Sequence, residues 1–171
     1  MANLKKFVKW FDLCAAALAL IALLLMFAPA ITYVKDGADL SAAYINDVSA
    51  FNGFQTIFGA VKNSDTGYLA FSFLNFLTLI FVVAAIVLLV LNNFGKGFKF
   101  LNLVAAGLLL VAGVFFFLTL AFTFAAENPV GSGVVQKGIY KENWALGVGA
   151  ILSGVFALLG AGVSGCKLLI K

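Results

Sequence analysis

The sequence predicts an all-α integral membrane protein, namely a four-helix transmembrane bundle with both termini in the cytoplasm and a small extracellular cap. Three observations support this fold class. Hydrophobic residues make up 64% and charged residues 11% of the 171 residues, whereas soluble domains have about 45–50% and about 25%. The apolar residues form four blocks that are long enough to cross a bilayer. The lysines gather beside these blocks, mostly on one side. We therefore expect residues 1–171 to form a single membrane domain.

The first predicted span covers residues 13–31 and follows a basic lead that contains three lysines and Trp10. This lead, the apolar block and the small residues at 28–30 also fit a secretory signal peptide. Asp12 interrupts the basic region, and we therefore predict a retained transmembrane helix instead.

The second and third predicted spans cover residues 68–91 and 100–124, and the fourth covers residues 144–166. A short basic segment, 92–99, joins the second span to the third. Both of these spans exceed the roughly 20 residues that a transmembrane helix needs. We therefore predict a tilted transmembrane hairpin, followed by a last helix that ends in lysines.

The distribution of lysines predicts the orientation. Seven lysines fall at the N-terminus, in the 92–99 segment or at the C-terminus, and four fall in the outer loops 32–67 and 125–143. Positive residues concentrate on the cytoplasmic side of membrane proteins. The termini and the 92–99 segment are therefore predicted to be cytoplasmic, and the other two loops extracellular.

The outer loops are predicted to form the cap. Phe51, Phe54 and Phe58 recur at helical spacing, which favours a short amphipathic helix, although Asn52-Gly53 is a competing turn signal. These aromatics are candidate contacts for a partner or a lipid, and burial on the membrane surface would also explain them. In the shorter loop, Gln136-Lys137-Gly138 between apolar pairs predicts a weak β-hairpin.

Small residues mark the fourth span. The candidate helix-packing positions are Ala150, Gly154, Ala157, Ala161 and Gly165. Small residues let membrane helices approach closely. They favour packing within the bundle, and the alternative is an interface with a second copy or with another membrane protein.

Few polar residues interrupt the spans. Asn75 is the deepest strongly polar residue, and Ser72 and Thr78 lie on the same helix. We expect Asn75 to form an interhelical hydrogen bond. No charge is predicted near the middle of a span, which argues against a proton-driven pump.

The composition excludes several chemistries, and no catalytic, cofactor or metal site is predicted. The chain contains no His, so it supplies no histidine ligand for haem or zinc and no Ser–His pair. Cys14 and Cys166 are lone cysteines that we expect to be buried as small apolar groups without a disulfide. The absence of Arg argues against nucleic-acid binding. An enzyme that acts on lipid through the outer carboxylates is a distant possibility.

The layout of four spans with a longer first outer loop resembles that of claudin-type and other tetraspan proteins. The first loop lacks the Trp and paired Cys of claudins and the Cys-Cys-Gly of tetraspanins, so no residue role is carried over. We expect a non-catalytic accessory, scaffolding or interaction subunit of a membrane complex, which contacts the lipid bilayer and another membrane protein or itself. The alternative is an oligomeric channel or transporter for a small or lipid-like solute. A Phe-rich chain without Arg hints at an AT-rich bacterial genome, and hence at the bacterial plasma membrane.

Overall fold

The computed structural model describes residues 2–33, 50–60, 68–94, 98–127, 135–138 and 144–169. The chain divides into two compact units. Unit 1 consists of Met1–Leu24, Thr78–Phe115 and Leu152–Lys171. Unit 2 consists of Leu25–Leu77 and Phe116–Ile151.

Most described residues are helical, and the long helices identify the chain as a membrane protein. These helices are α1 (Ala2–Leu24), α3 (Phe73–Phe94), α4 (Lys99–Phe117) and α6 (Val148–Leu169). Within the described residues, four segments are long and apolar enough to cross a bilayer. They are Trp10–Phe27, Phe73–Phe94, Lys99–Phe117 and Val148–Leu168. The predicted membrane bundle of four long helices is confirmed at this level.

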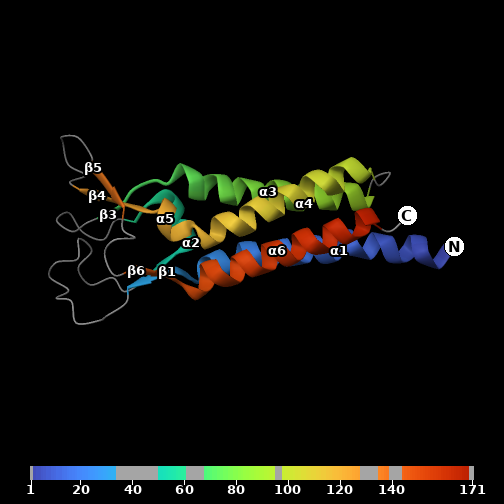
Figure 1. Ribbon diagram of the computed structural model, residues 1–171, viewed down its shortest axis with the longest axis horizontal. Helices are drawn as coiled ribbons and strands as arrows, with labels where there is room; N and C mark the ends of the chain where they lie inside the picture. The colour runs from blue at the N-terminus through green and yellow to red at the C-terminus, as the bar shows by residue number, and fades with distance from the viewer. Residues whose placement is uncertain are drawn as a thin grey trace. The chain divides into compact units, whose positions relative to one another are not determined.

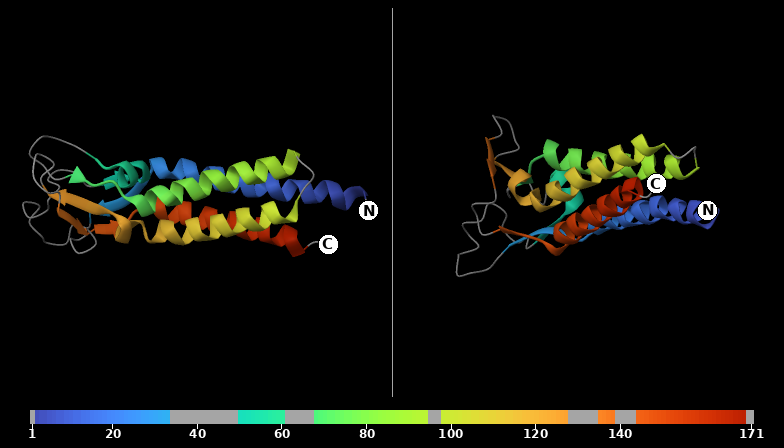
Figure 2. Two further views of the ribbon diagram at one scale, coloured as in Figure 1. Left: turned by 90° about the horizontal axis from the view of Figure 1, so that it is seen from above. Right: turned by 45° about the vertical axis from the view of Figure 1, so that its right-hand side comes forward.

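Unit 1 is a layered packing of these helices (Figures 1 and 2). Helix α6 lies against α1, because Ser153 Oγ donates a hydrogen bond to the Ala22 carbonyl at 2.8 Å. Small side chains make this approach possible: Ala15, Ala19 and Ala157 are fully buried. Membrane helices associate through such close packing, since lipid supplies no hydrophobic drive between them.

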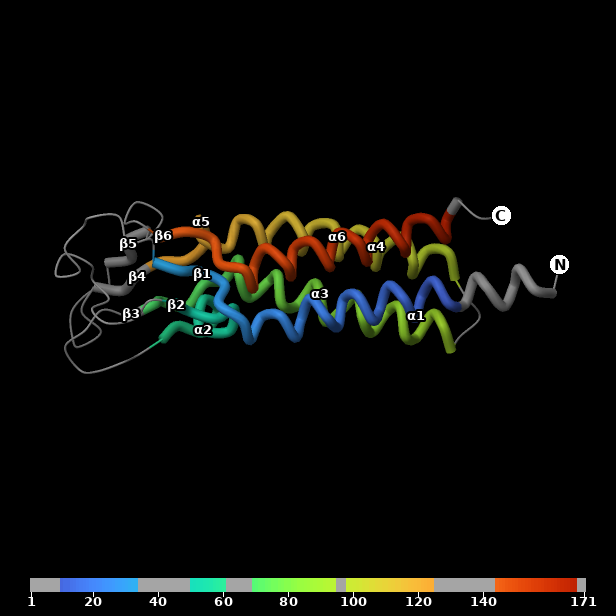
Figure 3. The backbone as a smooth tube through the Cα atoms, turned by 90° about the horizontal axis from the view of Figure 1, so that it is seen from below, coloured from blue at the N-terminus to red at the C-terminus, as the bar shows by residue number. Residues whose placement is uncertain are grey.

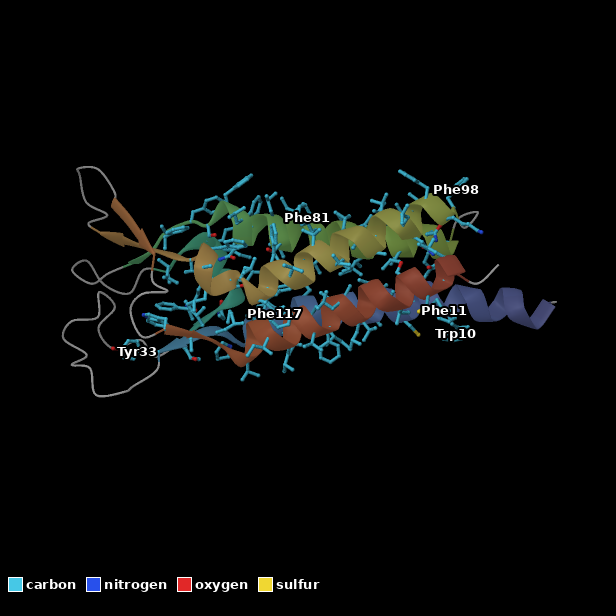
Figure 4. The ribbon with its side chains drawn as sticks, viewed as in Figure 1. Trp10, Phe11, Tyr33, Phe81, Phe98 and Phe117 are labelled. Atoms are coloured by element: carbon cyan, nitrogen blue, oxygen red, sulfur yellow. The ribbon has the colours of Figure 1, made fainter. Side chains whose placement is uncertain are left out.

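The end of α6 and the ends of α3 and α4 that are adjacent in sequence lie at the same end of unit 1 (Figure 3). Trp10 and Phe98 lie at this end and point away from the helices (Figure 4). Both side chains are exposed. Amphipathic aromatic rings are enriched at membrane–water interfaces, and this end of unit 1 fits such an interface.

Unit 2 contains two small antiparallel sheets. The first has the order β2-β1-β6, from β1 (Pro29–Tyr33), β2 (Ala50–Asn52) and β6 (Trp144–Leu146). The second has the order β3-β4-β5, from β3 (Tyr68–Leu69), β4 (Phe124–Glu127) and β5 (Val135–Gly138). The unit also contains η1 (Leu25–Phe27), α2 (Gly53–Phe58) and α5 (Thr119–Phe122).

A buried apolar cluster stabilises the first sheet. Ile31, Phe51, Leu69 and Trp144 are buried together, and the Phe51 and Trp144 rings lie 5.5 Å apart. At the start of α6, a Cβ added to Gly147 would collide with the Pro29 carbonyl oxygen. A glycine is needed there because the two backbones touch.

Helix α2 begins where a turn was expected to compete with a helix. Asn52 Oδ1 accepts a hydrogen bond from the Gln55 N–H at 2.9 Å, and Gln55 Oε1 accepts one from the Asn52 N–H at 2.9 Å. This reciprocal capping box stabilises the N-terminus of the helix. Asn52 is therefore a helix cap here rather than a turn residue.

The ends of the predicted spans need correction. The first long helix stops at Leu24, and 29–31 belong to a strand. Residues 68 and 69 and residues 144–146 are also strands, so the second and fourth helices start later than predicted. The third helix ends at Phe117 and is followed by the separate helix α5. Unit 2 therefore contains short strands at positions where the ends of transmembrane helices were predicted.

Two predictions for the outer loops were wrong. Gln136-Lys137-Gly138 lies within β5 and pairs with β4 instead of forming a turn. Phe51 lies in β2, one residue before the helix-capping residue, so it does not share a helix with Phe54 and Phe58. Several residues of these loops lie outside the described residues: the outer carboxylates at 36, 39 and 47, positions 134, 139 and 140 of the apolar pairs beside Gln136-Lys137-Gly138, and the lysines at 35, 62 and 141.

Candidate functional site

Unit 1 contains a buried polar group that we call the Asp12 cluster, made of Asp12, Asn92, Asn102, Ser164 and Lys167. Each long helix contributes to it: Asp12 comes from α1, Asn92 from α3, Asn102 from α4, and the last two residues from α6. The group therefore connects all four helices of the unit. Asp12 lies in α1 rather than in a separate basic lead.

Hydrogen bonds run through the cluster from one helix to the next. Lys167 Nζ forms an ion pair with Asp12 Oδ2. Asn92 Nδ2 donates to the same oxygen at 3.2 Å and to Asn102 Oδ1 at 2.5 Å. Ser164 Oγ donates to the Asn102 carbonyl at 3.2 Å. Lys167 lies in the last turn of α6, where the helix dipole also favours a positive charge.

The ion pair is largely removed from solvent. Asp12 is 1% exposed, and the Lys167 side chain is 13% exposed. A buried carboxylate without a cation would be strongly unfavourable, whereas a bonded pair neutralises both charges. Two buried acceptors of the cluster, Asp12 Oδ1 and Asn92 Oδ1, have no hydrogen-bond partner among the residues that the structure describes.

Unit 2 contains a second buried polar group, the Asn75 cluster, made of Thr56, Ser72, Asn75 and Thr123. Asn75 Nδ2 donates to the Thr56 carbonyl and to Thr123 Oγ1, both at 3.1 Å. Ser72 Oγ donates to the Phe122 carbonyl at 2.6 Å. Asn75 thus ties α3 to α2 and to the segment after α5, which supplies the expected contact between helices.

The residues of the predicted polar row are buried in the chain. Ser72, Asn75 and Thr78 are each no more than 3% exposed. Because these side chains face inward, an oligomer of the chain would not line a shared lumen with them. Asn75 Oδ1 has no hydrogen-bond partner among the described residues.

The predicted helix-packing residues of α6 are mostly internal. Ala150, Ala157 and Ala161 are buried, and so is Gly154, whereas Gly165 is half-buried. A Cβ added to Gly113 of α4 would lie 2.7 Å from the Leu158 side chain and 3.2 Å from the Gly154 carbonyl oxygen. Helices α4 and α6 are therefore in close contact at these glycines.

The three predicted loop aromatics have different environments. Phe51 is 4% exposed and belongs to the apolar cluster of the cap. The Phe54 ring lies 4.8 Å from the Phe27 ring. Phe58 is 57% exposed. Of the three, Phe58 offers the most surface to a partner or a lipid.

Sequence reasoning missed the Asp12 cluster, although one signal for it was present. Asp12 shares a helical face with Ala15, Ala16 and Ala19, and all three of these alanines are buried. A face of small residues predicts contact with another helix, so a carboxylate on that face requires a partner. Nothing local identifies Lys167, because it lies 155 residues further along the chain.

The described residues contain no group of three or more His, Cys, Asp or Glu side chains that could hold a metal ion. Cys14 and Cys166 are free and exposed, so the expectation of buried cysteines was wrong. The two polar clusters contain carboxylate, amide, hydroxyl and ammonium groups. These groups can bind polar or charged ligands and hold helices together.

No protein-family model, curated protein or solved structure matches this chain. Its function is therefore argued from the two polar clusters and the outward surface alone.

Proposed function

We propose that this chain is a non-catalytic subunit of a membrane complex, where it acts as an accessory or scaffolding protein for another membrane protein. One observation carries the proposal: the buried polar side chains of the two clusters form hydrogen bonds inside the chain. The outward surface of these helices is largely apolar. Such a molecule is equipped to hold its own fold and to present apolar helix faces to neighbours in the bilayer.

The proposed orientation places the termini and the 92–99 segment in the cytoplasm of a plasma membrane, bacterial by composition. The lysine distribution supports it, since seven of the eleven lysines fall in these segments. Asp12, an acidic residue on the proposed cytoplasmic side, lies in α1, and its charge is neutralised by Lys167. The outer cap is then extracellular.

Exposed aromatics of unit 2 are the proposed contact surface. Phe27, Phe58, Phe71 and Phe73 are all exposed in the structure. The rings of Phe58 and Phe71 lie 6.1 Å and 5.7 Å from the Phe76 ring. Aromatic side chains are enriched in the contact regions of protein interfaces. We propose that this surface contacts the partner protein.

Site-specific photocrosslinking in cells tests the surface. A photoreactive amino acid at Phe58 or at Phe73 is expected to give one discrete adduct with a second membrane protein. The same amino acid at the buried Phe51 is the control and is expected to give none. Adducts with lipid alone, from every exposed position, would contradict the proposal.

A channel or transporter is the second candidate, favoured by the unpartnered Asn75 Oδ1 in the interior of unit 2. A solute path would then run inside one chain rather than between copies. Asn75→Leu in liposomes separates the two candidates. A transporter would show flux with the native chain and lose it with the variant, whereas an accessory subunit would show no flux with either.

A further inference from the structure

Two hydrogen-bond acceptors of the Asp12 cluster are left without a partner among the described residues. Asn92 Nδ2 donates hydrogen bonds to Asp12 Oδ2 and Asn102 Oδ1, and Ser164 Oγ donates one to the Asn102 carbonyl. Lys167 Nζ is directed at Asp12 Oδ2. Asp12 Oδ1 and Asn92 Oδ1 are both buried, and neither has a partner in the described part of the chain. A buried acceptor without a partner is unfavourable, so this pair of oxygens favours a ligand that supplies positive charge or hydrogen-bond donors.

The two free oxygens belong to neighbouring side chains, because Asn92 Nδ2 lies 3.2 Å from Asp12 Oδ2. Asn102 Oδ1 lies 2.5 Å from the same Asn92 nitrogen. Carboxylate and amide groups of α1, α3 and α4 therefore meet in one buried place, and the two oxygens left free there are Asp12 Oδ1 and Asn92 Oδ1. Oxygen donors of this kind suit hard cations.

The charge of the cluster selects the class of cation. Asp12 is the single carboxylate of the cluster. The described residues contain no group of three or more His, Cys, Asp or Glu side chains of the kind that holds a divalent cation. One negative charge balances one monovalent cation. Lys167 already supplies such a charge, so an added cation would leave the buried site with a net positive charge unless the ammonium moved away.

Lys167 is able to move away. It lies in the last turn of α6, it carries a long flexible stem, and its side chain is 13% exposed whereas Asp12 is 1% exposed. Lysine commonly extends its charged end to water while its stem remains on apolar surface. The ammonium thus has a route to solvent that the carboxylate lacks.

From these observations we infer that the Asp12 cluster is an exchangeable binding site for a small monovalent cation such as Na⁺. The cation is held by the two free oxygens, Asp12 Oδ1 and Asn92 Oδ1, and its charge replaces that of the Lys167 ammonium beside Asp12. This site is separate from the aromatic contact surface in unit 2 and does not depend on the accessory function.

The first test compares thermal unfolding of the purified protein in sodium chloride and in choline chloride of equal ionic strength. The bulky quaternary ammonium of choline keeps its charge away from oxygen ligands, whereas Na⁺ is a small hard cation that such oxygens coordinate directly. At a Na⁺ concentration of roughly ten times the dissociation constant, the midpoint is expected to rise by about 4 °C. Equal midpoints in the two salts would overturn the inference and leave a water molecule as the ligand of the two oxygens.

A double variant and a matched control locate the effect. Asp12→Asn combined with Lys167→Met removes both charges together and avoids an unpaired buried charge; the sodium-dependent shift is expected to vanish. Ser153→Ala alters a different α1–α6 hydrogen bond and is expected to keep the shift. A shift that persists in the double variant would overturn the assignment to this cluster.

A second readout uses the native chain, so it does not depend on a variant that folds. Exchange releases the Lys167 ammonium to water, and its acylation by an amine reagent should then be faster in sodium chloride than in choline chloride. The exposed Lys99 is the internal reference and should react equally in both salts. An unchanged Lys167-to-Lys99 ratio would contradict the exchange.

Discussion

At the scale of single residues, the buried polar side chains of these helices are stabilised by partners from distant parts of the chain. Asp12 and Lys167 are 155 residues apart in sequence and form one ion pair. Asn75 bonds to Thr56 and Thr123, from different elements. The need of Asn75 for a partner was predictable, because an unpaired amide in an apolar environment is unfavourable. The identity of each partner was not, since it depends on long-range packing.

The Asp12–Lys167 pair gives the first prediction. Lys167→Met leaves a buried carboxylate without its cation and is expected to destabilise the protein by about 3–5 kcal/mol. Adding Asp12→Asn to this variant should recover much of that loss, because neither charge is then left unpaired. A double-mutant cycle of unfolding free energies, measured without sodium, provides the check. Additive effects of the two single changes would contradict the pair.

At the scale of elements, the apolar pattern predicted the helices but not their ends. Blocks of apolar residues continue from α1 into β1 and from β6 into α6 without a polar break. A short apolar run fits a buried strand and a helix equally well. The strands are decided by pairing between β1 and segments that are distant in sequence, β2 and β6. The local pattern therefore predicted transmembrane helix for residues of β1 and β6.

The contact of α4 with α6 gives the second prediction. A Cβ at Gly113 would meet Leu158 at 2.7 Å and the Gly154 carbonyl oxygen at 3.2 Å, whereas one at Gly107 of the same helix would meet nothing within 4 Å. Gly113→Ala is expected to destabilise the protein by about 1–3 kcal/mol. Gly107→Ala should be neutral or stabilising, because alanine favours helix. Equal midpoints in denaturant titrations would contradict this packing.

The junction between β6 and α6 gives the third prediction. A Cβ at Gly147 would meet the backbone at Pro29 and Ala30, which cannot turn aside as a side chain can. Gly147→Ala should therefore destabilise the protein by at least about 2 kcal/mol. Gly162→Ala, on the open side of α6, serves as the control and should have little effect. Thermal unfolding of both variants measures the difference, and a Gly147→Ala protein as stable as the control would argue against the junction.

At the scale of the whole molecule, composition predicted the class of protein but left its biological role open. The excess of apolar residues and their grouping into long blocks indicate a membrane protein, since no water-soluble core of this size could bury them. The function depends on contacts with other molecules, and few residues identify such contacts. Phe51 and Phe58 illustrate the difficulty: they are the same residue type in one loop, but one is buried in the cap and the other is exposed.

The orientation in the membrane gives the fourth prediction. In a chain with Cys14 and Cys166 replaced by Ser, Gly131→Cys should react with an impermeant thiol reagent added outside intact cells. Gly95→Cys should react only after the membrane is opened, because the lysine distribution predicts a cytoplasmic position for it. Mass shifts of the purified protein report the labelling. Reaction of both positions from outside would contradict the orientation.

The central proposal is that the chain serves as a subunit for another membrane protein. The most direct measurement is the mass and composition of the complex purified gently from native membranes after crosslinking in cells. We predict a complex that contains a second, different membrane protein in fixed stoichiometry with this chain. A complex that contains only copies of this chain would contradict the accessory function and favour a channel or a self-assembling scaffold.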